Sequence, residues 1–238
     1  TNIGLDHTDM LGNTLAEIAY EKAGIIKPGI PVVIGEAHPE TKPVFEKTAL
    51  KKSAEIIFAE DLALEKYTSD LTGSYQLKNI QTVIAAFQVL KEEFSISEEN
   101  IGTGLLKVKA STGLRGRWDI LHLEPKVFCD TAHNAEGLFY AINQLLKEKY
   151  DQLHIVIGVV NDKDLKKILP LFPKEAVYYF CRPNVPRGME AVGLKDSAYH
   201  YGLFGAVYFS VSKAYEAGLS AASAAGVGYA GGRTFTVA

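Results

Sequence analysis

The segment TNIGLDHTDMLGNTLAEIAYEKAGIIKPG, residues 1–29, decides the fold of the first part of the chain. After an apolar start, its side chains repeat at the i, i+3, i+4 and i+7 spacing of an amphipathic helix. This stripe is formed by Leu15, Ile18, Ala19 and Lys22. The spacing therefore predicts a helix whose core-facing side includes a lysine.

Capping signals mark both ends of this helix. Thr14 and Glu17, three residues later, form the capping box that is typical of a helix start. Gly24 suits the end of the helix, and Pro28 prevents its continuation. The helix is therefore predicted to lie between these signals.

A lysine on the apolar side of a helix needs a physical explanation. A buried amine must find a partner, lose its proton or be chemically modified, because an unpaired buried cation is very costly. The alternative is that Lys22 extends along its own alkyl stem to solvent. Just upstream, Asp6, His7 and Asp9 place ionisable groups near the helix start. Together these residues indicate a phosphate or metal site, although a histidine after an apolar strand is often only hydrogen-bonded structure.

Composition narrows the class of protein. The chain has 238 residues, of which 47% are hydrophobic and 22% are charged, with a net charge of −3 and two cysteines, Cys129 and Cys181. Two cysteines indicate no disulfide framework, and the slight acidity argues against nucleic acid as a partner. No apolar run reaches the roughly 18 residues of a membrane span. We expect a cytoplasmic globular protein that does not bind membranes.

Strand-like and helical patterns alternate along the chain, which indicates an α/β fold with a mostly parallel sheet in its second half. The stretch STGLRGRW is the best domain linker because it combines two glycines with small polar residues. The expected domains are residues 1–111, a linker at 112–117 and residues 118–238. Strands are predicted at 31–35, 56–59, 118–123, 126–129, 153–160, 176–181, 205–209, 226–230 and 234–237. Helices are predicted at 40–52, 78–91, 97–109, 135–149, 163–169, 194–201 and 211–222.

The strand at 126–129 runs directly into a polar segment. Asp130 ends the strand, and Asn134 is placed to cap the next helix. Ligands of doubly wound sheets bind at the carboxyl ends of strands, which favours a ribose or phosphate role for Asp130. Its alternative role is that of a second capping carboxylate.

Five short motifs carry a resemblance to a known family. They are GLDH at 4–7, EKAGI at 21–25, YQLKN at 75–79, GRW at 116–118 and DTAHN at 130–134. In combination they resemble the folylpolyglutamate and dihydrofolate synthase family of the Mur ligase superfamily. The resemblance implies part of a Mur-ligase-type central ATPase domain, followed by a Rossmann-like C-terminal ligase domain.

The resemblance also implies roles for two residues at the start of the chain. His7 corresponds to a magnesium ligand, and Lys22 corresponds to a carbamylated lysine that helps to organise magnesium and the reacting phosphate. Carbamylation converts the cation into an oxygen donor suited to Mg²⁺. A histidine ligand is less expected for Mg²⁺ and rests on the family alone.

The nucleotide site implied by the resemblance uses the remaining motifs. Asn79 corresponds to an adenine contact, Arg117 to a nucleotide contact, Asp130 to a ribose ligand and His133 to its neighbour in the motif. Arginine suits bidentate recognition of phosphate, whereas a linker arginine is most often only solvated. The family places this nucleotide site between its two domains.

The implied reaction is ATP-dependent amide formation with Mg²⁺. The carboxylate of a folate takes the γ-phosphoryl group of ATP, and L-glutamate then displaces phosphate from the acyl phosphate. A monomer is expected, with folate and glutamate as its small-molecule substrates. Two alternatives stay open: another Mur-type amino acid ligase, and a non-catalytic nucleotide-binding module.

One motif of the family's ATPase domain is missing from the sequence. No Gly-rich loop of the G-x-x-x-x-G-K-[ST] type occurs, and the chain begins at Thr1 in an apolar strand pattern. We therefore expect an additional N-terminal portion in the complete protein, and we expect the 238 residues alone not to turn over ATP. Glutamate-dependent ADP release by the purified chain would contradict this prediction.

Overall fold

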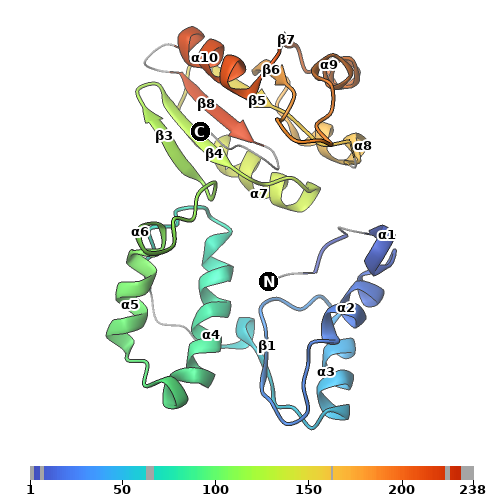
Figure 1. Cartoon of the computed structure of the whole chain (residues 1–238), viewed down its shortest axis with the longest axis vertical. Coiled ribbons are helices and arrows are strands. Elements are labelled where there is room, and N and C mark those ends of the chain that lie inside the picture. Colours follow the sequence, from blue (N-terminus) through green and yellow to red (C-terminus); the bar gives the residue numbers. More distant parts are fainter. Residues whose placement is uncertain (1–2, 6–7, 63–66, 162, 223–225, 232–238) are drawn as a thin grey trace. The chain divides into compact units, whose positions relative to one another are not determined.

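The computed structural model describes residues 3–5, 8–62, 67–161, 163–222 and 226–231, with the backbone alone for residues 8 and 9. The chain divides into two compact units (Figure 1). Unit 1 comprises Thr1–Asp70 and Tyr75–Thr112, and unit 2 comprises Leu71–Ser74 and Gly113–Ala238.

Unit 1 combines helices with a small parallel sheet of two strands. Its strands are β1 (Val32–Ile34) and β2 (Ile56–Phe58), paired in parallel. Its helices are α1 (Thr8–Leu11), α2 (Leu15–Ala23), α3 (Lys42–Lys51), the short 3₁₀ helix η1 (Ala59–Asp61), α4 (Gln76–Phe94), α5 (Glu98–Leu106) and α6 (Val108–Thr112). A core of small and aromatic side chains, including Ala19, Phe45 and Ala49, joins α2 and α3 to this sheet.

The helix predicted at 97–109 is divided into α5 and α6. The backbone N–H of Lys107 donates to Gly104 O at 3.2 Å, which closes the last turn of α5. A carboxylate oxygen of Asp70 then accepts from the backbone N–H of Lys109 at 2.9 Å, in the first turn of α6. A side chain 39 residues away in the sequence therefore starts a second helix, which local spacing could not reveal.

Unit 2 is built on a six-stranded sheet in the order β3-β4-β8-β5-β6-β7. The strands are β3 (Asp119–Leu123), β4 (Lys126–Asp130), β5 (Leu153–Ile157), β6 (Val177–Cys181), β7 (Gly205–Tyr208) and β8 (Val227–Gly231). The helices are α7 (Ala135–Leu145), α8 (Leu165–Ile168), the 3₁₀ helix η2 (Leu169–Leu171), α9 (Ala191–Tyr199) and α10 (Val211–Ala221). The mostly parallel α/β sheet predicted from the sequence is confirmed. The strand predicted at 234–237 lies outside the described residues.

One edge strand of this sheet is antiparallel. β3 pairs antiparallel with β4, whereas every other neighbouring pair is parallel. Only Glu124 and Pro125 separate the two strands, and a parallel pair needs a much longer crossover. Strands β4, β5, β6 and β8 therefore end at one common edge, which is the usual ligand-binding edge of such sheets.

Helices cover both faces of the sheet. Leu138 and Ile142 of α7 and Leu194 of α9 pack in one core with Phe128 and Tyr178. On the opposite face, Ala214 of α10 packs with Val156 of β5 and Tyr179 of β6. Successive side chains of a strand point to opposite faces of a sheet, so Tyr179 lies on the other face from Tyr178. Figure 1 shows α7 and α10 on opposite sides of the strands. Within the described part of the chain, none of the helices combines the length and apolar character needed to span a bilayer.

A buried histidine under α10 should make the stability of unit 2 depend on pH. His154 is 6% exposed, and its Nδ1 lies 2.9 Å from the hydroxyl of Tyr179. Burial lowers the pKa of His154 below its ordinary value of 6.5. Because the unfolded chain then binds a proton more readily than the folded one, stability should be complete above pH 6.5 and fall as the pH drops below it.

The measurement is the melting temperature between pH 7.5 and 5, compared with His154→Gln, which keeps a neutral hydrogen-bonding side chain. The decrease in melting temperature on acidification should be smaller in the variant. His200→Gln is the control, because His200 is exposed. Identical pH profiles for the wild type and His154→Gln would contradict the prediction.

Candidate functional site

The first predicted site lies at α2. Its capping box is confirmed: the backbone N–H of Glu17 donates to Thr14 Oγ1 at 3.2 Å, and Glu17 Oε2 accepts from the backbone N–H of Thr14 at 3.0 Å. The backbone N–H groups of Asn13 and Thr14 both donate to the Glu17 carboxylate, and these two hydrogen bonds lower the pKa of Glu17. The helix ends at Gly24, as predicted.

The prediction that Lys22 faces the core is wrong. Ile18, Ala19 and Ala23 are the buried residues of α2, and Lys22 is exposed. The buried stripe continues from Ala19 to Ala23, four residues later, so that Lys22 falls at its edge. At this position the amine reaches water and avoids the cost of burying a charge.

The predicted metal ligand His7 and its neighbour Asp6 lie outside the described residues, and the side chain of Asp9 is not described. In the described part, no group of three or more His, Cys, Asp or Glu side chains could hold a metal ion.

The predicted adenine contact, Asn79, lies in the first turn of α4 in unit 1. Its side-chain amide donates from Nδ2 to Gln76 Oε1 at 2.9 Å. Gln76 is 5% exposed and Asn79 is half-buried. The hydrogen bond that Asn79 donates to Gln76 restricts the orientation of the Asn79 amide.

The GRW motif forms a tight turn at the start of unit 2. Gly116 has φ +70° and Trp118 has φ +57°, so both residues adopt the left-handed conformation. The backbone N–H of Gly116 donates to Asp119 Oδ2, and that of Trp118 donates to Asp130 Oδ2 at 2.9 Å. Two carboxylates thus hold the turn that carries Arg117.

Asp130 ends β4 as predicted, and it is buried. Its side chain is 2% exposed, and besides Trp118 it accepts from the backbone N–H of Ala132, at 2.8 Å. The cap of α7 is Asn134, whose Oδ1 accepts from the backbone N–H of Gly137 at 2.8 Å. The carboxylate of Asp130 therefore joins two loops.

Arg117 and His133 meet the same residue of the DTAHN motif. The Arg117 guanidinium donates from Nη1 to the hydroxyl of Thr131, and it also lies 3.3 Å from Gly116 O. His133 Nδ1 lies 3.0 Å from the carbonyl oxygen of Thr131. The structure therefore brings together three of the predicted residues, Arg117, Asp130 and His133.

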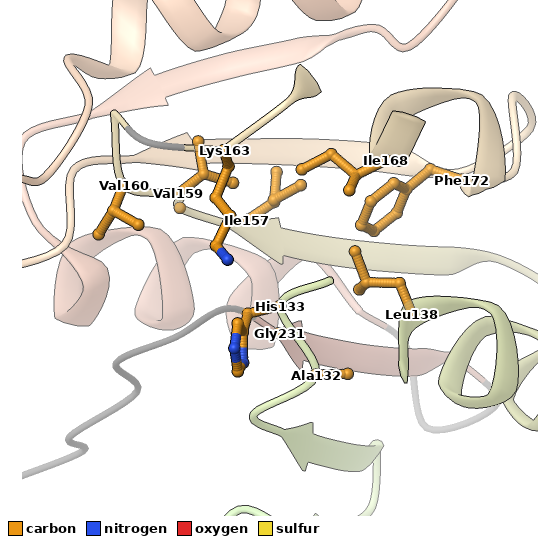
Figure 2. A pocket seen from close by; sticks show the side chains of 11 residues that line it. Ala132, His133, Leu138, Ile157, Val159, Val160, Lys163, Ile168, Phe172 and Gly231 are labelled. Atoms are coloured by element: carbon orange, nitrogen blue, oxygen red, sulfur yellow. The ribbon is translucent and has the colours of Figure 1, made fainter. Parts of the chain in front are cut away.

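A pocket opens beside this cluster at the carboxyl ends of the strands (Figure 2). Its cavity is small, with a volume of about 20 Å³, and it is partly open to solvent. Its polar side chains are those of His133 and Lys163, and apolar residues such as Leu138, Ile157 and Phe172 supply much of the rest. Figure 2 shows the Lys163 amine directed toward the His133 ring.

Lys163 was not among the predicted site residues. It lies in NDKDLKKIL, where several charged residues look alike in the sequence. The signal that distinguishes it is its place in the loop after β5, at the ligand-binding edge of the sheet.

The two cysteines contribute no reactive thiol. Burial raises the pKa of Cys129 and of Cys181 to about 12, and the charges of Asp130 and Asp119 act in the same direction on Cys129. Both thiols therefore stay protonated at neutral pH, which excludes them as thiolate nucleophiles.

Comparison with known proteins finds one family model that matches part of the chain and several similar proteins. Residues 116–228 match the Mur ligase, glutamate ligase domain. The dihydrofolate synthase/folylpolyglutamate synthase of Bacillus subtilis is 30% identical over 225 residues, covering 83% of this chain and 51% of that protein. The Escherichia coli enzyme of the same name is 30% identical over 244 residues, covering 94% of this chain and 54% of that protein.

The structural comparison agrees. The structure described as E. coli FolC in complex with DHPP and ADP has a TM-score of 0.80 and 28% sequence identity, over 97% of this chain and 56% of that chain. The chain thus spans about half the length of the curated relatives it matches.

Proposed function

We propose that residues 116–228 form a Mur ligase glutamate ligase domain, and that the chain corresponds to the C-terminal part of the folylpolyglutamate and dihydrofolate synthases. From this premise we propose that the protein containing it is an ATP-dependent ligase that adds L-glutamate to a folate. The observation that carries the proposal is the cluster of Arg117, Asp130 and His133 beside a pocket containing Lys163.

The proposed reaction has two steps. A carboxylate oxygen of the folate attacks the γ-phosphorus of ATP and ADP leaves, which produces an acyl phosphate. The glutamate amine then attacks the acyl carbon, and inorganic phosphate leaves. Such chemistry needs mainly positioning and neutralisation of negative charge. Arg117 supplies a fixed positive charge suited to phosphate oxygens.

We propose that the mouth of the pocket in unit 2, where Lys163 lies, receives one end of the amino acid substrate. A carboxylate of glutamate can form a charge-assisted hydrogen bond with the Lys163 amine. His133 lines the same pocket, together with apolar residues. We propose that Lys163 binds the incoming glutamate.

The remaining assignments extend the proposal to the other motifs. Asn79 contacts the adenine and Asp130 contacts the ribose, while His7 and a carbamylated Lys22 act with Mg²⁺, which neutralises phosphate charge when bound. His7 lies outside the described residues. The division at residues 112 and 113 supports an assignment of unit 1 to the ATP-binding domain and of unit 2 to the ligase domain. We further propose a monomer that acts in the cytoplasm and does not bind nucleic acid.

The experiment that tests the proposal measures ADP release by the full-length protein with folate, glutamate and ATP. Lys163→Ala should raise the KM for glutamate by roughly 10- to 100-fold, which corresponds to the loss of one hydrogen bond to a charged group. The KM for ATP should change less than about twofold, because the pocket is assigned to the amino acid.

The matched control is Lys166→Ala, since Lys166 is an exposed lysine on the following helix α8. An unchanged KM for glutamate in Lys163→Ala would remove Lys163 from the site. Absence of folate-dependent ADP release, together with activity on another acceptor, would favour a different Mur-type ligase. Nucleotide binding without any ligase activity would favour a binding module.

A further inference from the structure

Thr131 occupies the one position of the D-x-A-H-N motif that the motif leaves open. It directly follows β4 and is half-buried. Two other residues of the motif, Asp130 and His133, carry proposed roles. Thr131 itself has no role in the reaction as proposed above.

The hydroxyl of Thr131 connects the two loops of the candidate nucleotide site. It accepts a hydrogen bond from Arg117 Nη1 and donates one to Gly116 O at 3.0 Å. The backbone N–H of Thr131 donates to the same carbonyl at 2.9 Å. A single residue therefore holds both the backbone before Arg117 and the end of the Arg117 side chain.

The methyl group of Thr131 completes this contact. A Cβ atom added to Gly116 would lie 2.4 Å from Thr131 Cγ2, so the threonine side chain packs directly on the glycine. Gly116 is also in the left-handed region, at φ +70°. The backbone of one loop thus fits closely against the side chain of the other, which leaves the hydroxyl little freedom to rotate away.

We infer that Thr131 is a positioning residue that orients the guanidinium of Arg117 for the nucleotide. An arginine side chain has many rotamers, and a free one must lose this freedom when it binds a ligand. The hydroxyl of Thr131 restricts the guanidinium before the ligand arrives. This inference rests on the proposed function, in which Arg117 holds phosphate oxygens.

The test is ADP affinity, measured by isothermal titration calorimetry on the full-length protein. Thr131→Val keeps the shape of the side chain and removes the hydroxyl, so ADP should bind roughly tenfold more weakly. Thr131→Ser keeps the hydroxyl and should stay within about threefold of the wild type. Arg117→Ala should weaken ADP binding at least as much as Thr131→Val.

The double variant Arg117→Ala/Thr131→Val distinguishes positioning from general damage. If Thr131 acts through Arg117, its loss has no further effect once the guanidinium is absent, so the double variant should bind ADP like Arg117→Ala alone. Melting temperatures of Thr131→Val and Thr131→Ser should agree within a few degrees. Additive losses, or equal losses in the valine and serine variants, would overturn the inference.

The ADP affinities of Arg117→Ala and Thr131→Val show whether the inference or the proposed function has failed. If Arg117→Ala binds ADP like the wild type, the assignment of Arg117 to the nucleotide is wrong. If Arg117→Ala binds weakly and Thr131→Val binds normally, the assignment of Arg117 stands and the role of Thr131 is rejected.

Discussion

Replacement of Lys22 by alanine in the full-length protein should lower kcat for glutamate-dependent ADP release by about 100- to 1,000-fold, the effect of losing one electrostatic contact in a transition state. The proposed carbamate would supply carboxylate-like oxygens near the reacting phosphate. Lys22 is exposed in unit 1, so burial on the apolar side of α2 gives no reason to expect a modified amine. Its assignment therefore depends on the EKAGI motif, and kinetics must decide it.

Two further variants separate modification from charge. Lys22→Arg keeps the positive charge but has no amine to carbamylate, so it should be as inactive as Lys22→Ala. A small carboxylic acid added to Lys22→Ala should restore part of the rate. Lys51→Ala is the matched control, because Lys51 is exposed in the last turn of α3. A wild-type kcat in Lys22→Ala would exclude Lys22 from the mechanism.

Local sequence signals predicted those parts of the structure that depend on local contacts. The caps at Thr14 and Asn134 are set by partners three residues away, and both are present. Asp130 ends its strand because the apolar run stops there. Such features follow from spacing and hydrogen-bonding capacity alone.

Features that depend on distant partners were not predictable in this way. β8 is the last described strand in the sequence but lies in the middle of the sheet, between β4 and β5. Lys22 shares the spacing of a buried stripe, yet it is Ala23 that is buried against its neighbours. The hydroxyl of Thr131 meets a guanidinium 14 residues earlier in the sequence. Each depends on contacts between segments that are distant in the sequence, which no local pattern encodes.

Replacement of Asp130 by alanine should lower the free energy of unfolding of unit 2 by about 2–6 kcal/mol, since it leaves two backbone N–H groups unpaired and each costs about 1–3 kcal/mol. The carboxylate accepts from the backbone N–H groups of Trp118 and Ala132, at 2.9 and 2.8 Å. Asp130→Asn keeps one acceptor oxygen and replaces the other with a donor, so its loss should be smaller but of the same sign.

Urea unfolding followed by tryptophan fluorescence measures this effect. Trp118 is the single tryptophan of the chain and is 3% exposed, so its signal reports on unit 2. Asp151→Ala is the control, because Asp151 is exposed, and it should change the free energy of unfolding by less than about 0.5 kcal/mol. Far-ultraviolet circular dichroism provides a second probe, independent of the turn at Trp118.

The same variants separate the structural role of Asp130 from its proposed role at the ribose. A carboxylate that only joins the two loops would affect ADP binding through Arg117, so Asp130→Asn should have no further effect on ADP affinity in Arg117→Ala. A ribose ligand would weaken ADP binding even in Arg117→Ala, because an amide cannot accept as two oxygens do. Wild-type stability in both variants would show that the two backbone N–H groups do not depend on this carboxylate, and the turn that carries Arg117 would need another support.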